Sequence, residues 1–155
     1  MIQWFEVKVK YDKTLDTGAV KAVPETYLVD GLSFTEAEAR ITEEMMPYVT
    51  GEFMVTAVKK AKFDDVLYHE GGDRWYKVKI NMITIDEKTA AEKKTPSLTL
   101  VQASTLEEAL QVFLESMKGV AFDYEIASVT ETPLMDVFAA NLNQTLADKA
   151  AKKEA

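Results

Sequence analysis

Two segments of the sequence, IQWFEVKVK near the start and DRWYKVKI near the middle, place a tryptophan ahead of lysines at alternating positions. In an extended strand alternate side chains point to the same face, so each tryptophan lines up with its lysines. The two sets are Trp4, Lys8 and Lys10 in the first segment and Trp75, Lys77 and Lys79 in the second. An indole ring can stack on a base while ammonium groups contact phosphate, so these six residues are predicted to bind single-stranded nucleic acid or a nucleotide. The alternative is that both tryptophans are buried and that the lysines keep the strands soluble.

A second group of reactive side chains surrounds His69, the single histidine of the chain. Glu70 is its neighbour, and Asp64, Asp65 and Asp73 lie close to it in the sequence. Such donors could hold a metal ion for phosphodiester hydrolysis. However, the glycine pair that follows marks a turn, and the segment lacks the helical spacing of motifs such as H-E-x-x-H. The sequence therefore predicts neither a metal site nor a cofactor.

Other catalytic arrangements find no support in the sequence. The chain has no cysteine, no glycine-rich phosphate loop and no G-x-S-x-G elbow. With one histidine, acid–base chemistry would rest on carboxylates or lysine, and no pair of them stands out. We therefore predict a protein that is not an enzyme.

The composition is acidic and rich enough in apolar residues to form a core. The 155 residues are 47% hydrophobic, with a formal net charge of −8 and a pI near 4.8. That suffices for one ordinary core or for two half-domains that share one. The acidity argues against a surface that binds nucleic acid all round, but it allows a local basic patch. Without a signal-peptide pattern or a membrane-length apolar run, we expect a cytoplasmic protein with no membrane partner.

The chain matches itself at an offset of about 71 residues, in one unbroken order. Equivalent positions include Trp4 with Trp75, Pro24 with Pro96, Leu28 with Leu100, Ile41 with Phe113 and Asp65 with Asp136. Several such matches in register favour a tandem duplication over chance similarity.

Each copy reads as strand, strand, helix, strand. Alternating apolar residues indicate the strands, and Ser33 with Glu36 and Thr105 with Glu108 match the capping box that begins a helix. Apolar residues follow each cap at helical spacing: Phe34, Ala37, Ile41 and Met45 in the first copy, and Leu106, Ala109, Phe113 and Met117 in the second. Each helix therefore has one face for packing on a sheet.

These patterns predict an α+β fold, a tandem duplication of a strand-strand-helix-strand unit with antiparallel sheet and pseudo-two-fold symmetry. Residues 1–140 are expected to form a single domain of two repeats, 1–70 and 73–140, because one copy alone is too thin to be stable. The stretches KFDDVLYH and TPLMDVFAANL, which follow the third strands, are expected to be short helical or irregular segments. Residues 141–155 are expected to form a C-terminal helix or tail.

The segments WFEVKVKYD, YLVDGLSFTEAEARI, GDRWYKVKI and DYEIASVTETPLMDVF also carry a family resemblance. Through them the chain closely resembles the small uncharacterised proteins known as domain of unknown function 4494, up to about Phe138. We associate this family with Bacteroides-like gut bacteria, their mobile elements and their phages. The resemblance implies two classes of function, a nucleic-acid-handling accessory protein and a host-interaction or anti-defence protein.

The sequence thus leads to one functional expectation and one rival. We expect a non-enzymatic binding protein of phage or mobile-element type, a homo-oligomer, that contacts single-stranded nucleic acid or a nucleotide through the first strand of each repeat. The rival is a protein-binding inhibitor whose acidic surface engages a basic partner.

Overall fold

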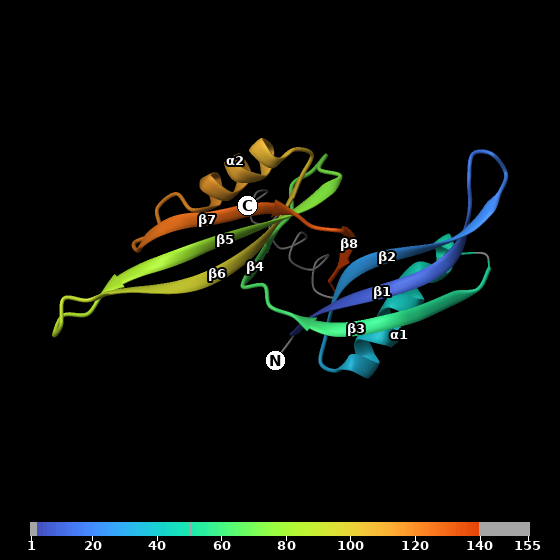
Figure 1. Cartoon of the computed structure of the whole chain (residues 1–155), viewed down its shortest axis with the longest axis horizontal. Helices are drawn as coiled ribbons and strands as arrows, with labels where there is room; N and C mark the ends of the chain where they lie inside the picture. The colour runs from blue at the N-terminus through green and yellow to red at the C-terminus, as the bar shows by residue number, and fades with distance from the viewer. Residues whose placement is uncertain (1–2, 50, 140–155) are drawn as a thin grey trace, which may run out of the picture. The chain divides into compact units, whose positions relative to one another are not determined.

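The computed structural model describes residues 3–49 and 51–139. In these residues the chain forms an α+β fold of eight strands, two α-helices and one 3-10 helix, divided into two compact units (Figure 1). Of these residues, the first unit comprises 3–49, 51–61 and 134–139, and the second comprises Lys62–Pro133. The C-terminal segment 141–155, predicted as a helix or tail, lies outside the described residues.

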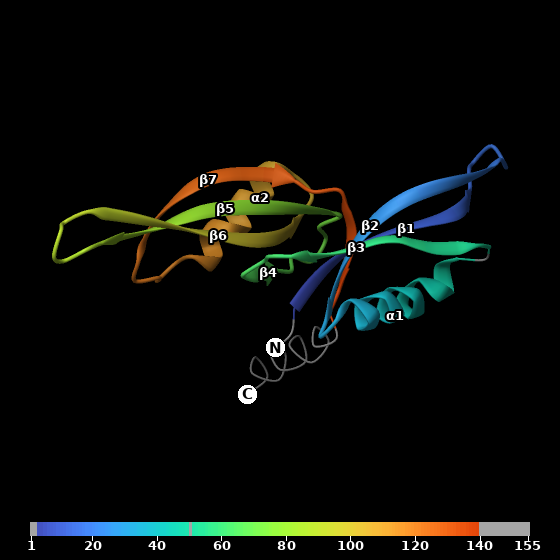
Figure 2. The same cartoon turned by 60° about the horizontal axis from the view of Figure 1, so that its bottom comes forward.

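The first unit is a four-stranded sheet in the order β3-β1-β2-β8, with one α-helix on one face. Its elements are β1 (Gln3–Thr14), β2 (Val20–Gly31), α1 (Phe34–Met45), the 3-10 helix η1 (Met46–Tyr48), β3 (Phe53–Ala61) and β8 (Leu134–Phe138). β1 pairs antiparallel with β2 and with β3, with a register shift between Lys8 and Val9 on the β3 side. Figure 2 shows α1 running along one face of this sheet.

The second unit is a four-stranded sheet in the order β4-β6-β5-β7, again with one α-helix. Its elements are β4 (Asp65–Leu67), β5 (Arg74–Ile85), β6 (Glu92–Ala103), α2 (Leu106–Ser116) and β7 (Asp123–Glu131). β5 pairs antiparallel with β6 and β7, again with a register shift, here between Lys79 and Ile80.

The sheets are mixed, which corrects the prediction of antiparallel sheet. β8 joins β2 in parallel and β4 joins β6 in parallel, and both short strands come from the stretches expected to be helical or irregular. Each lies at the end of one predicted repeat but pairs within the sheet formed by the other. The two compact units divide after Ala61 and after Pro133.

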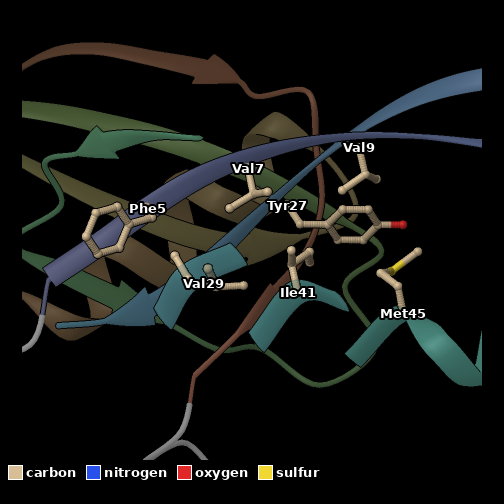
Figure 3. Close-up of a cluster of buried hydrophobic side chains, with 8 residues drawn as sticks. Phe5, Val7, Val9, Tyr27, Val29, Ile41 and Met45 are labelled. Atoms are coloured by element: carbon tan, nitrogen blue, oxygen red, sulfur yellow. The ribbon is translucent and has the colours of Figure 1, made fainter. Parts of the chain in front are cut away.

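Each unit has its own cluster of buried apolar side chains between sheet and helix. In the first unit Val7, Val29 and Ile41 are fully buried (Figure 3), and in the second Val78 and Phe113 are almost fully buried. The predicted burial of the equivalent residues Ile41 and Phe113 is confirmed. The first apolar residue predicted for each helix face is not buried. Phe34 and Leu106 are 47% and 44% exposed, because they lie in the first helical turn.

Both helices begin at the predicted caps. Ser33 Oγ accepts a hydrogen bond from the backbone N–H of Glu36, and Thr105 Oγ1 accepts one from that of Glu108, each at 3.1 Å. Each glutamate side chain accepts in return from the N–H of the residue before the cap, at 3.0 and 3.1 Å. These contacts fix where each helix starts after the second strand of its unit. Neither helix in the described residues is long and apolar enough to span a membrane.

Candidate functional site

The first predicted ligand-binding set lies on the face of β1 that points away from α1. Along this strand Phe5 and Val9 are fully buried in the core, while Lys8 and Lys10 are exposed on the opposite face. Trp4 shares that face and is half-buried. The alternation predicted for this strand is therefore present, and the aromatic ring and both ammonium groups remain accessible from one side.

The side chains around the two lysines are small or apolar. Lys8 lies opposite Thr26 on β2 and Ala57 on β3, and Lys10 lies opposite Pro24 and Met54. Met54 is 61% exposed, and a hollow of about 570 Å³ borders it and Lys10 near the end of the hairpin. On the β2 side Thr26 and Leu28 are buried, so a ligand would reach the lysines from the β3 side, where Ala57 and Met54 are exposed.

One acidic residue, Glu6, lies on the same face between Trp4 and Lys8. Lys59 on β3 is its cross-strand neighbour, and the Lys59 ammonium lies 3.8 Å from Glu6 Oε1. This ion pair is exposed, so it contributes less than about 1 kcal/mol to stability. Its effect on the face is to balance the Glu6 charge. Asp12, exposed on the same face, and Glu52 border the hollow beside Lys10, so the excess positive charge of the face is centred on Lys8.

The spacing along β1 sets the length of ligand that the face suits. Trp4 and Lys10 are six residues apart, which is about 20 Å at the rise of a β-strand. A ligand that touched both would have to be longer than a single nucleotide. An extended polyanion with flat groups satisfies this requirement.

The second predicted set lies on β5 in a different environment. Trp75 is 2% exposed, which for this residue agrees with the alternative of a buried tryptophan and not with a ring that is open to a ligand. Tyr68 packs edge to face against the indole, with ring centroids 5.5 Å apart. The backbone carbonyl of Trp75 accepts hydrogen bonds from both the N–H and the hydroxyl of Thr132, each at 2.8 Å. Trp75 is therefore held as a core residue.

The lysines of the second set are also less available. Lys77 is half-buried and Lys79 is exposed. Further along, the Lys94 ammonium lies 2.9 Å from Glu125 Oε1, and this carboxylate also accepts a hydrogen bond from Asn81. The hydrogen bond between them raises the pKa of Lys94 and lowers the pKa of Glu125. Lys94 is thus neutralised locally, and Lys79 is the exposed cation of the predicted set.

The register of the parallel strands explains why the two tryptophans differ. Leu67 on β4 pairs with Val101, and Phe138 on β8 pairs with Val29 in the same way. The residue after Leu67 is Tyr68, whereas the residue after Phe138 is Ala139. A methyl group cannot cover an indole as a phenol ring does, which is consistent with the partial exposure of Trp4.

The family resemblance is confirmed by comparison with known proteins. Residues 3–140 match the family described as Domain of unknown function (DUF4494). The chain belongs to the DUF4494 family. No curated protein and no solved structure shows significant similarity to it.

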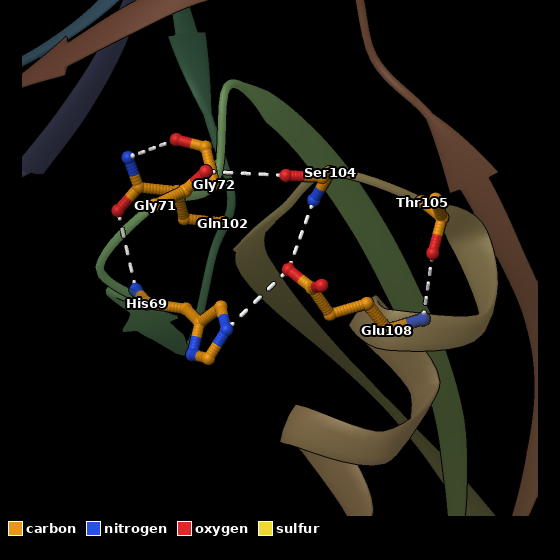
Figure 4. A network of polar contacts seen from close by, with 7 residues as sticks. All are labelled: His69, Gly71, Gly72, Gln102, Ser104, Thr105 and Glu108. Atoms are coloured by element: carbon orange, nitrogen blue, oxygen red, sulfur yellow. Dashed lines mark hydrogen bonds and ion pairs between the residues drawn. The ribbon is translucent and has the colours of Figure 1, made fainter.

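In this DUF4494 protein, His69 belongs to a network of polar contacts that has a structural role (Figure 4). The His69 Nε2 lies 3.4 Å from Glu108 Oε1, and the His69 backbone N–H donates to Gln102 Oε1. Gln102 in turn donates to the Gly72 carbonyl at 3.0 Å, and Ser104 Oγ donates to that of Gly71. The network ties the turn before β5 to the end of β6 and the start of α2. Within residues 3–49 and 51–139, no three histidine, aspartate or glutamate side chains are grouped closely enough to hold a metal ion.

Sequence reasoning missed the residues that cover Trp75 and the aromatic cluster around Tyr27. Both depend on β4 and β8, which bring Tyr68 and Phe138 into their sheets. A usable signal was present, because DVLY and MDVF both contain an Asp-Val pair that is followed by an apolar or aromatic residue. In both, the aspartate Oδ1 accepts from the next backbone N–H, at 2.9 and 2.8 Å.

Proposed function

We propose that this DUF4494 protein binds single-stranded nucleic acid, without catalysing a reaction, through the face of the first sheet that points away from α1. The observation that supports this function is the alignment of half-buried Trp4 with the exposed Lys8 and Lys10 on one rigid strand. Base stacking on the indole and phosphate contacts to the ammonium groups are the two contributions that sequence-tolerant single-strand binding requires.

The proposal rests on the first unit. Trp75 takes no part, because its ring is buried against Tyr68, and the matching face of the second unit contributes Lys79 as its exposed cation. The length of the first face favours a strand of several nucleotides over a free nucleotide. Two phosphate contacts, at Lys8 and Lys10, predict a modest salt dependence, with a slope of about −1.4 for the logarithm of the binding constant against that of the salt concentration.

Tandem duplication is part of the same proposal. The sheet orders β3-β1-β2-β8 and β7-β5-β6-β4 correspond element by element when the chain is offset by one repeat. The register shifts after Lys8 and after Lys79 fall at equivalent residues. We infer that two copies of one unit, with a pseudo-two-fold relation, diverged so that the first kept an accessible tryptophan and the second buried it.

We also propose a setting, on the basis of the resemblance described above. A phage or mobile element of Bacteroides-like bacteria produces single-stranded intermediates in the cytoplasm of its host, where such a protein would act. The outer strands β3 and β7 each leave one edge unpaired within their described sheets, and such edges favour self-association into a homo-oligomer.

Matched lysine variants test the proposed face. We expect Lys8→Gln and Lys10→Gln each to reduce the salt slope of oligonucleotide binding by about one, whereas Lys79→Gln leaves it nearly unchanged. The three lysines are exposed strand residues, so the folded state should tolerate each change. Equal effects of all three variants would show that binding is non-specific attraction to any surface lysine.

A second candidate function is protein binding through an acidic surface. The exposed face of α1 carries four glutamates, Glu36, Glu38, Glu43 and Glu44. A basic protein partner would be attracted to them. This candidate predicts no oligonucleotide binding at low salt and loss of partner binding when Glu43 and Glu44 are replaced by glutamine.

A further inference from the structure

The first unit contains an aromatic pocket on the helix side of its sheet, away from the face proposed to bind nucleic acid. The pocket has a volume of about 330 Å³, within the range of small-ligand sites. Its aromatic walls are Tyr11, Tyr27, Tyr48 and Phe138. The rings of Tyr27 and Phe138 are stacked, with centroids 5.6 Å apart and planes 18° apart.

The wall formed by Tyr27 is rigid. This side chain is 7% exposed and belongs to the core cluster, where it lies with Val9 and Met45 (Figure 3). The rim is accessible, because Tyr48 is 74% exposed and Met135 is 53% exposed. The pocket thus combines a fixed interior with an open entrance.

A carboxylate organises two of the tyrosines. The hydroxyl of Tyr11 donates to Glu25 Oε1, and that of Tyr27 donates to Glu25 Oε2 at 3.3 Å. Burial, the hydrogen bond to Glu25 and the charge of Glu25 raise the pKa of Tyr11 to about 12, and burial with the same charge raises the pKa of Tyr27. Both phenols therefore stay protonated near neutral pH, and each oxygen of Glu25 already accepts a hydrogen bond.

The electrostatic character of the pocket favours a cation. Asp136 lines it, and Glu25 lies behind the two tyrosines. Among the described residues that line the pocket, none is lysine, arginine or histidine. Aromatic faces attract cations through the ring quadrupole, and the two carboxylates add to that attraction.

We propose that this pocket binds an organic ammonium group that carries methyl substituents. A primary ammonium would lose hydration and need several acceptors. Besides rings and the thioethers of Met45 and Met135, the lining offers one carboxylate, Asp136, because Glu25 is already engaged. A methylated ammonium is weakly hydrated and needs no hydrogen bond, so aromatic walls suit it. Such a group occurs in free choline-like molecules and on methylated lysines of proteins.

Calorimetric titration of the full chain with choline tests the proposal. We expect saturable binding, and binding weaker by about tenfold or more for the uncharged isostere in which a tert-butyl group replaces the trimethylammonium. Tyr48→Ala should weaken choline binding by about 2- to 30-fold, the range expected for one lost cation–π contact. Because Tyr48 is mostly exposed, the variant should fold.

The controls separate this site from general surface effects. Phe122→Ala removes a partly exposed ring of the second unit, 40% exposed, and should leave choline binding unchanged. Asp136→Asn keeps an oxygen that can accept from the Val137 N–H but removes the charge, so it should weaken choline binding and not that of the isostere. Equal affinity for choline and its isostere, or no saturable binding, would overturn the proposal.

Titrations with two peptides show whether the methylated ammonium group belongs to a protein or to a free molecule. A peptide that contains trimethyllysine and binds more tightly than choline would support the proposal with a protein-borne ammonium, whereas equal affinity would support it with a free molecule. An unmethylated lysine peptide that binds as tightly as the methylated one would contradict it.

Discussion

Tyr68 and Trp75 pack edge to face, with ring centroids 5.5 Å apart and ring planes at 88°. Such a pair adds about 0.5–1.5 kcal/mol beyond the burial of its area. The contact gives Trp75 the role of a core side chain, although its segment has the same alternation as the one around Trp4. Two strands of similar pattern therefore place their tryptophans differently, with Trp75 buried and Trp4 half-buried.

The helix–sheet cores should be sensitive to truncation. Phe113 is 1% exposed and Ile41 is fully buried, so Phe113→Ala should cost about 3–5 kcal/mol and Ile41→Ala about 2–5 kcal/mol of unfolding free energy. Leu114→Ala is the matched control, because Leu114 is next along the same helix but 42% exposed, and it should cost much less. Denaturant unfolding measures all three. Similar losses for Phe113→Ala and Leu114→Ala would mean that the buried face of α2 has been misassigned.

Much of the local structure could be predicted from the sequence, because it depends on nearby residues. The alternation in segments such as EVKVK follows from the two-residue period of side chains along a strand. The buried helix positions follow from the helical period, and the caps at Ser33 and Thr105 follow from hydrogen-bonding chemistry. The pairing of β4 and β8 could not be predicted in this way. Val66 and Leu67 form too short a run to be distinguished from an irregular segment, and their partner strand lies more than thirty residues away in the chain.

The same limit applies to the candidate site. The exposure of Lys8 and Lys10 follows from alternation alone, so it was predictable. The burial of Trp75 depends on Tyr68, which reaches it through the unpredicted strand. The aromatic pocket likewise needs Phe138 beside Tyr27, a contact across more than a hundred residues.

The two glycines before β5 should differ sharply in their tolerance of alanine. A Cβ on Gly72 would lie 2.7 Å from the backbone nitrogen of Ala103 and 2.8 Å from its Cα, so Gly72→Ala must displace the backbone of β6. A Cβ on Gly71 would meet nothing within 4 Å, and its cost is the strain of a φ of +89°, about 1 kcal/mol. We expect the larger loss of thermal stability for Gly72→Ala. The reverse order would contradict the close approach of this turn to β6.

Stability should fall at alkaline pH because of Tyr11. Burial and Glu25 raise the pKa of Tyr11 from 10.0 to about 12 in the folded chain. Below pH 10 both folded and unfolded chains hold the proton, so the contribution is fully present. As the pH rises from 10 to 12, the unfolded chain releases the proton first, and folding stability declines.

Removal of the hydroxyls tests this assignment. Denaturant midpoints measured across this alkaline range should fall less steeply for Tyr11→Phe than for the natural chain, and less steeply still when Tyr27→Phe is added, because the pKa of Tyr27 is raised as well. The same alkaline slope in the natural chain and the double variant would show that other groups cause the decline.

The proposed function requires that Trp4, and not Trp75, stacks on bases of single-stranded nucleic acid. The most direct measurement is the emission of each indole alone while a short oligonucleotide is added at low salt to the Trp75→Phe and Trp4→Phe chains. We expect saturable quenching of the Trp4 emission, no change in the Trp75 emission, and a loss of about 1–3 kcal/mol of binding free energy in Trp4→Ala. Folded Trp75→Phe chains whose Trp4 emission does not respond to any oligonucleotide at low salt would contradict it.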